Sequence, residues 1–341
     1  DKVYYLPKKE IVTYDYVAES KDLPYERIET LNKMQEMRTG VVITTIEAVL
    51  QKMISKKALY KSTLNFKVGD SENLETIKQK LVELGYVRCD LIEGRGQFSV
   101  RGGIVDISVN EKEGVRLEFW GDEIDSIRYF NVVSQRSTEN IDKITIYPAH
   151  EYILESNIED VITNIRNTIY SEKLQETIEQ DIELIKAGNY ISKIDRYLNS
   201  FYTEQDTILD YITDKYLVFL DEQSKIEQRT INVNKDSQNI IQLLIDKEKI
   251  IPEALKNICN FNQFEDKLND KQIIYVEKLD NEVKIQAEKY KWIYKERNFS
   301  KSEIEILFKE LLKAQEEKKR IYILAETKEK AKKICSLLNE K

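Results

Sequence analysis

The 341-residue sequence has few of the residues on which metal sites and catalytic centres are built. It contains a single histidine, His150, and three cysteines that lie far apart, Cys89, Cys259 and Cys335. Structural zinc sites use closely paired cysteine or histidine ligands, so the sequence predicts no metal site. It also predicts no catalytic residues. His150 alone would have to serve any catalytic triad, and its place after Pro148-Ala149, at an expected domain junction, favours a structural or surface role.

Glycine, long apolar runs and excess positive charge are also scarce. With ten glycines in the chain, phosphate-binding loops are few, and the GxxxxGK[ST] loop does not occur. No apolar run reaches the roughly 18–20 residues that span a bilayer, and no signal peptide is visible, so we expect a cytoplasmic protein without membrane contact. The 53 basic and 61 acidic residues give a net charge of −8, which argues against strong phosphate-driven binding of nucleic acid. Because the sequence starts with Asp1, we expect a fragment or a processed form.

The length allows two or three domains, and the first residues predict an α/β domain. Val41–Thr44 is a β-branched run, and Thr45 is a candidate N-cap for a helix whose apolar spacing continues to Met53. This order of strand, cap and helix is typical of parallel sheets. A further strand is expected at Glu10–Asp15, and a helix over about 25–37.

The next part, over about 64–149, predicts a small α+β domain inserted into the first. Ser71 is a candidate N-cap for a helix that ends at Gly85. Short strands separated by Gly, Asn and Asp turns then indicate an antiparallel meander. These strands are Gln97–Arg101, Ile104–Val109, Val115–Trp120 and Ile124–Phe130.

The remaining sequence is mainly helical, with apolar stripes that predict helices over 158–169 and 174–185. Tyr216–Leu220 is typical of a buried parallel strand, and Ile273–Val276 predicts another. The last stretch predicts the start of a further small α/β domain, made of a helix over about 302–317, a strand at 321–325 and a helix capped by Thr327.

Asp221-Glu222, after four apolar residues, has the form of a Walker B motif, in which a carboxylate orients Mg²⁺ and water. A nucleotide site also needs the glycine-lysine loop, which this sequence lacks. The simpler interpretation is a strand that ends in solvated acidic residues.

Side-chain alternation in the meander is more informative. In the strand that ends at Trp120, the apolar residues face one way, while Arg116, Glu118 and Trp120 face the other. Arg101 lies on the same non-core face of its own strand. Arginine and tryptophan are enriched at interaction hot spots, so these residues predict a partner-binding surface. The pattern also fits a tryptophan packed beneath a helix beside solvated arginines.

Two segments of the meander resemble the bacterial transcription-repair coupling factors (Mfd). They are Gly96–Ile107 (GQFSVRGGIVDI) and Arg116–Arg128 (RLEFWGDEIDSIR). The repair protein UvrB shares a looser version of the same pattern. Further landmarks of the family follow its order at Leu23–Tyr25, Val42–Thr45, Ser134–Ser137 and Tyr147–Glu151.

This resemblance implies a modular protein. Residues 1–63 and 150–290 would be the halves of a degenerate, RecA-like helicase domain with a parallel sheet, in which Asp221-Glu222 holds the degenerate Walker B position. Residues 64–149 would be an inserted UvrA-binding domain, and residues 291–341 would begin the following small α/β domain.

The resemblance also implies a non-catalytic fragment that recruits UvrA to lesions at stalled RNA polymerase. The family uses two arginines and an aromatic residue for this contact, which match Arg101, Arg116 and Trp120, with tryptophan in place of the usual phenylalanine; Glu118 shares their face. No cofactor is expected in this fragment. ATP and Mg²⁺, RNA polymerase and DNA would be bound by other parts of a full-length bacterial protein that we expect to be monomeric.

Two alternatives stay open. The fragment could be a UvrB-like ATPase or DNA-binding piece that uses Asp221 and Glu222. The face with the arginines and Trp120 could also be autoinhibitory, masked within the full-length protein by its C-terminal domain.

Overall fold

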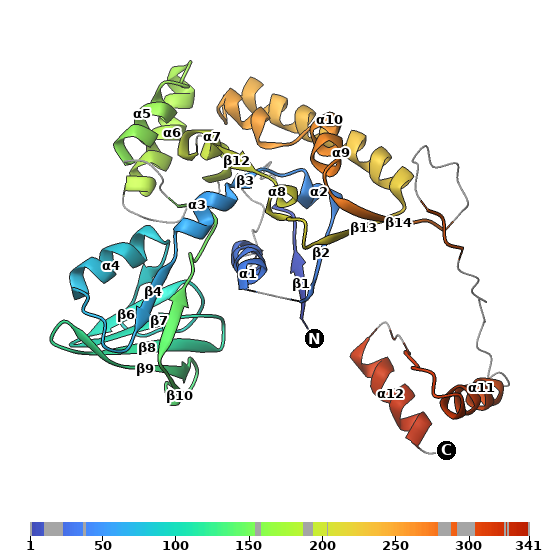
Figure 1. The fold of residues 1–341 in the computed structure, drawn as a ribbon. Coiled ribbons are helices and arrows are strands. Elements are labelled where there is room, and N and C mark those ends of the chain that lie inside the picture. Colours follow the sequence, from blue (N-terminus) through green and yellow to red (C-terminus); the bar gives the residue numbers. More distant parts are fainter. Residues whose placement is uncertain are drawn as a thin grey trace. The chain divides into compact units, whose positions relative to one another are not determined.

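The computed structural model is a mixed α/β protein that contains both parallel and antiparallel strands (Figure 1). It describes residues 2–9, 23–36, 39–153, 158–186, 194–202, 204–278, 288–291, 304–323, 325 and 327–339. The chain divides into two compact units, Asp1–Asn281 and Glu282–Lys341. Over the described residues, we find no helix with the length and hydropathy required to cross a membrane.

The first unit begins with a parallel pair of strands. β1 (Val3–Leu6) pairs with β2 (Val41–Thr44), and α1 (Leu23–Glu36) packs beside them. The strand predicted at Glu10–Asp15 lies outside the described residues.

The helix after β2 is shorter than its apolar spacing predicts. α2 (Ile46–Val49) is capped as expected, since the Thr45 hydroxyl accepts a hydrogen bond from the Ala48 amide. Its predicted extension to Met53 is wrong, because Met53 begins β3 (Met53–Ile54). Both residues of β3 are fully buried and pair with a strand far along the chain. That partner is β12 (Gln205–Asp206), and α3 (Lys56–Lys61) follows β3.

A two-stranded ribbon connects this region to a six-stranded sheet. β4 (Leu64–Lys67) runs antiparallel to β11 (Lys143–Ile146), so the chain leaves and returns at one place. The sheet between them has the order β10-β9-β8-β7-β6-β5, and only β5 and β6 are parallel. The predicted meander is therefore confirmed. The strands are β5 (Val87–Arg88), β6 (Gln97–Arg101), β7 (Ile104–Ser108), β8 (Glu113–Trp120), β9 (Glu123–Asn131) and β10 (Ser137–Ile141).

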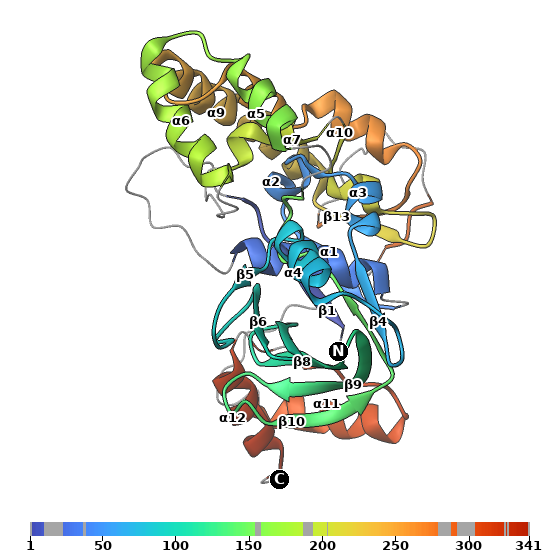
Figure 2. The same cartoon turned by 90° about the vertical axis from the view of Figure 1, so that its left-hand side faces the viewer.

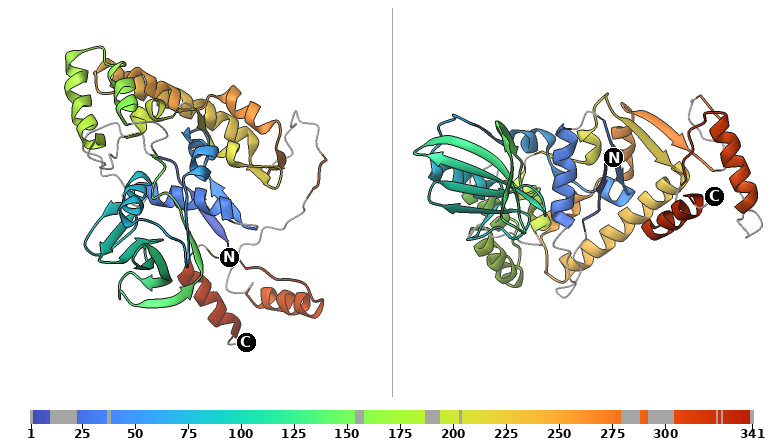
Figure 3. Two further views of the ribbon diagram at one scale, coloured as in Figure 1. Left: turned by 60° about the vertical axis from the view of Figure 1, so that its left-hand side comes forward. Right: turned by 90° about the horizontal axis from the view of Figure 1, so that it is seen from below.

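One face of this sheet packs against α4 (Leu74–Glu83), which Figures 2 and 3 show beside the teal and green strands. The helix is capped by Asn73 and not by the predicted Ser71, since Asn73 accepts bonds from two amides of the first turn while Ser71 bridges to Glu123. Gly85 follows the helix with φ +86°, and a Cβ there would lie 2.1 Å from Nε2 of His150. The His150 ring therefore packs directly against Gly85, at the end of α4.

The chain then becomes mainly helical, as predicted. The two helices expected from apolar stripes are present as α5 (Ile158–Arg166) and α6 (Glu172–Lys186), and their buried residues belong to the same hydrophobic core as those of β1 and α1. The other α-helices of this unit are α7 (Leu198–Phe201), α8 (Ile208–Tyr211), α9 (Gln223–Asp246) and α10 (Phe261–Leu268).

Two further strands form a parallel pair, β13 (Leu217–Asp221) with β14 (Gln272–Val276). The expectation that β13 is buried is wrong, because Leu217 is 48% exposed and Phe219 62% exposed. Among the described residues this sheet has two strands, and one of its faces is open.

The second unit contains α11 (Ile304–Glu316) and α12 (Lys328–Asn339). Thr327 caps α12 as predicted, with its hydroxyl 3.2 Å from the Lys330 amide. The strand predicted at 321–325 is wrong over 321–323 and 325, which adopt no strand; the described part of this unit supplies no partner strand.

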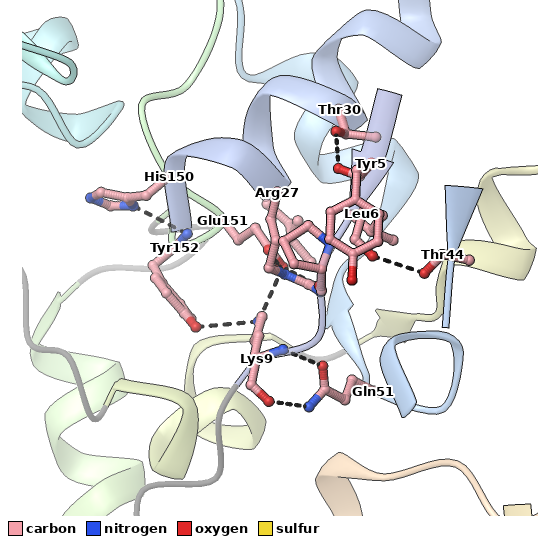
Figure 4. A network of polar contacts seen from close by, with 12 residues as sticks. Tyr5, Leu6, Lys9, Arg27, Thr30, Thr44, Gln51, His150, Glu151 and Tyr152 are labelled. Carbon is pink, nitrogen blue, oxygen red and sulfur yellow. Dashed lines mark hydrogen bonds and ion pairs between the residues drawn. The ribbon is translucent and has the colours of Figure 1, made fainter. Parts of the chain in front are cut away.

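A buried ion-pair network connects the segment that follows β11 with β1 and α1 (Figure 4). Arg27 of α1 and Glu151 are only 1% and 3% exposed, and Arg27 Nε donates to Glu151 Oε1 at 2.5 Å. Arg27 also donates to the carbonyl of Pro7, just after β1. Lys9 Nζ lies 3.0 Å from Glu151 Oε2 and 3.2 Å from the Tyr152 hydroxyl. Each buried charge therefore has an opposite charge beside it.

This network predicts a loss of stability in acid. Burial raises the pKa of Glu151, but the charges and hydrogen bonds of Arg27 and Lys9 outweigh burial and lower that pKa from 4.5 to about 2. Burial lowers the pKa of His150 from 6.5 to about 4. At both positions the folded protein binds fewer protons than the unfolded chain, so the contribution of these two groups to stability is complete above pH 6.5 and is lost as the pH falls towards 2. Urea midpoints measured from pH 7.5 to 3 should decrease, and Glu151→Gln should flatten the part of the decrease below about pH 4.5. An unchanged slope in this variant would contradict the assignment.

Candidate partner-binding face

The face of the six-stranded sheet opposite α4 carries polar side chains. On β7 and β8, residues that alternate with the core point to this side. The strand register aligns Ser99, Asp106, Arg116 and Arg128 in one row across β6, β7, β8 and β9. A neighbouring row contains Arg101, Ile104, Glu118 and Ser126.

One end of this polar face is covered by the connection between β5 and β6. The Ser99 hydroxyl donates to the Asp90 carbonyl at 2.9 Å, and Ile92 packs with Phe130 and Val132. The accessible remainder contains Arg101, Arg116, Glu118, Trp120 and Arg128, and we call it the arginine face.

Two arginines of this face share one buried carboxylate. Asp106 is 1% exposed. Arg116 donates to it through two atoms, Nε to Oδ1 at 2.7 Å and Nη2 to Oδ2 at 2.9 Å. Arg101 Nη2 donates to the same Oδ2 at 2.8 Å. The hydrogen bonds from Arg116 to Asp106 raise the pKa of Arg116, so Arg116 stays protonated. The Arg116 guanidinium also lies 5.1 Å above the ring of Phe130.

Glu118 is paired with one residue of its own row, Ser126, and with one of the neighbouring row, Arg128. Its Oε2 accepts hydrogen bonds from the Ser126 hydroxyl at 2.9 Å and from Nη2 of Arg128. Burial raises the pKa of Glu118, but these hydrogen bonds and the charge of Arg128 outweigh it, so the net shift is downward and Glu118 is ionised at neutral pH. The face therefore holds its charges in fixed pairs.

Trp120 is the most exposed part of the arginine face. It lies at the end of β8, just before the turn at Gly121 (φ +64°), and is 85% exposed. It points to the same side of β8 as Arg116 and Glu118. The register shift near the turn adds an extra residue to β9 and none to β8, so the alternation of side chains along β8 continues unbroken to Trp120. The interpretation in which Trp120 packs beneath a helix is wrong.

The structure thus places all the residues predicted for partner binding on one surface. Sequence reasoning missed two residues there, Asp106 and Arg128. A signal for Asp106 was present, since it lies between Val105 and Ile107 in a strand whose alternation directs it to the polar side.

The Walker B-like residues lie in a different sheet. Asp221 ends β13, and Glu222 is the N-cap residue of α9, with φ +63°. Glu222 pairs with Lys225 at 2.9 Å and lies 3.9 Å from Lys278. No cluster of three or more His, Cys, Asp or Glu side chains that could hold a metal ion is found among the residues described.

Comparisons with known proteins point to one family. The model of the UvrB interaction domain matches residues 64–152, which contain the whole arginine face. The transcription-repair-coupling factor of Bacillus subtilis (strain 168) is 29% identical over 259 residues, covering 72% of this chain and 22% of that protein. That of Staphylococcus haemolyticus (strain JCSC1435) is 26% identical over 352 residues, covering 99% of this chain and 30% of that protein. That of Staphylococcus aureus (strain bovine RF122 / ET3-1) is 25% identical, covering all of this chain and 30% of that protein.

The chain therefore spans less than a third of the length of these relatives. Matches over 99% and 100% of the chain show that the likeness extends well beyond the six-stranded sheet. The resemblance to the transcription-repair-coupling factors that the motifs predict is confirmed, and residues 64–152 match the model of the UvrB interaction domain.

Proposed function

We propose that this protein recruits UvrA in transcription-coupled DNA repair and that the arginine face is the contact surface. The observation that carries the proposal is an 85% exposed tryptophan, Trp120, beside two carboxylate-paired arginines in a UvrB interaction domain. An uncovered tryptophan beside partly exposed arginines has the composition of an interface hot spot.

The chemistry of this face suits an acidic partner surface. A guanidinium has five N–H donors, of which Arg116 uses two and Arg101 one on Asp106. The other donors of these two arginines can bind carboxylates of UvrA, and such charge-assisted bonds are stronger than neutral ones. Trp120 would add roughly 200 Å² of buried surface next to them.

The rest of the chain would act as a scaffold. We propose that the parallel pairs β1–β2 and β13–β14 belong to a degenerate helicase-like domain into which the UvrB interaction domain is inserted. In this proposal the fragment has no catalytic activity and binds no cofactor. ATP, Mg²⁺, DNA and RNA polymerase would be bound by other parts of a full-length protein.

Replacing Trp120 tests this function. Trp120→Ala is expected to weaken UvrA binding about 30-fold, because truncating a central aromatic anchor costs about 2 kcal/mol or more. Its exposure predicts an unchanged unfolding midpoint. Biolayer interferometry with immobilised UvrA measures the affinity. The matched control is Tyr322→Ala, which removes a 78% exposed aromatic residue from the other unit and should bind like wild type. Wild-type affinity of Trp120→Ala would contradict the proposed surface.

A further inference from the structure

The two arginines predicted to contact UvrA are joined through one buried group. Asp106 lies between Arg101 and Arg116 in the sheet and is 1% exposed, whereas Arg101 is 51% exposed and Arg116 16% exposed. Arg116 holds the carboxylate through two parallel bonds, a geometry that fixes the plane of its guanidinium as well as its position.

The position of Asp106 makes it unavailable to any partner. Its oxygens accept three hydrogen bonds, all from these two arginines: Oδ1 accepts one and Oδ2 accepts two. The backbone of Asp106 is fixed between β6 and β8 at the centre of the sheet. The carboxylate is therefore a rigid anchor beneath two otherwise flexible side chains.

We propose that Asp106 is the positioning residue of the arginine face and holds both guanidiniums in the orientation that receives carboxylates of the partner. This inference rests on the proposed function. Without the anchor, each arginine would have to be ordered during binding, and ordering long side chains at an interface lowers the affinity.

The charge of Asp106 makes the opposite outcome possible, which sharpens the test. Asp106 neutralises part of the positive charge of the face. If overall charge controlled the binding of an acidic partner, Asp106→Asn would bind more tightly. If orientation controls it, Asp106→Asn binds more weakly, by about tenfold.

The experiment measures the affinity of the 341-residue chain for UvrA by isothermal titration calorimetry. Asp106→Asn, Arg116→Ala, Trp120→Ala and the double variants are compared. If Asp106 acts by positioning, the losses of binding free energy caused by Asp106→Asn and Arg116→Ala are strongly non-additive, since both remove the ordered Arg116. The losses caused by Asp106→Asn and Trp120→Ala should instead add, so that the fold-changes in affinity multiply. A general distortion of the sheet would instead make Asp106→Asn non-additive with Trp120→Ala as well. The control Ser108→Ala removes a buried hydroxyl from the same strand and face, one that accepts from the Gln97 amide and not from the arginines.

A second readout needs no partner. In the free protein, the Arg116 Nε–H should give a slowly exchanging ¹H–¹⁵N cross-peak that disappears in Asp106→Asn. Loss of this peak together with weaker binding supports positioning. Unchanged or tighter binding of Asp106→Asn, with Arg116→Ala weakened, would overturn it and leave the proposed function intact. If neither Arg116→Ala nor Trp120→Ala weakens binding, the proposed function itself fails.

Discussion

Replacing Arg27 with alanine is expected to lower the free energy of unfolding by about 3–5 kcal/mol, which is the cost of breaking a buried ion pair from one side. The substitution leaves Glu151 3% exposed and removes its closest cation. It also leaves the Pro7 carbonyl without the guanidinium that bonds it. Lys9 remains 3.0 Å from Glu151 and is only 13% exposed, so it offsets part of the loss.

Urea denaturation at pH 7 measures this effect through the unfolding midpoint. The matched control is Arg166→Ala, which removes a bidentate arginine pair with Glu179 at the surface, where the two side chains are 45% and 33% exposed. Exposed pairs are worth about 0–1 kcal/mol, so this variant should stay close to wild type. Equal stability losses in the two variants would show that the buried network does not anchor the sheet to β1 and α1.

Replacing Arg101 and Arg116 together is expected to weaken UvrA binding by about 1,000-fold. Each arginine, if central, contributes about 2 kcal/mol or more, which is about 30-fold. The double variant also removes all three hydrogen bonds to Asp106, and an unpaired buried carboxylate would repel the acidic surface of a partner.

Two controls separate binding from folding in this experiment. Adding Asp106→Asn to the double variant removes the unpaired charge and should restore part of the stability without restoring binding. Arg88→Ala with Arg166→Ala removes the same net charge from exposed positions outside the arginine face and should keep wild-type affinity. Equal losses in both double variants would indicate that overall charge, not this face, attracts UvrA.

Local pattern correctly predicted which residues share one face of the sheet, because alternation along a strand repeats every two residues. Alternation along single strands placed Arg116, Glu118 and Trp120 on one side, and the sheet keeps them there. The same rule applied to Asp106, but a lone acidic residue in a strand does not show which cations it will meet. Its pairing with Arg101 and Arg116 depends on the register of β6, β7 and β8, which the sequence does not display.

The errors in the predicted fold share one cause, which is that contacts between residues distant in the sequence decide the structure there. Met53 continues the helical spacing after Thr45, but pairing with Asp206 draws it into a strand. Tyr216–Leu220 is an apolar run typical of a buried strand, but Leu217 and Phe219 within it are exposed. How much of a strand is covered depends on its neighbours and not only on its own composition.

The two rival functions make different predictions for the same reagents. A UvrB-like ATPase would bind nucleotide, and Asp221→Asn would abolish hydrolysis. Masking of the arginine face would make a full-length protein bind UvrA more weakly than this chain, whereas equal affinities would remove masking from consideration.

The most direct test of the account is the affinity of purified UvrA for this chain and for its Arg101→Ala, Arg116→Ala variant, measured side by side by calorimetry with both proteins shown to be folded. The account predicts saturable binding of the wild-type chain and a loss of about 1,000-fold in the variant. Binding of the variant with wild-type affinity would contradict it.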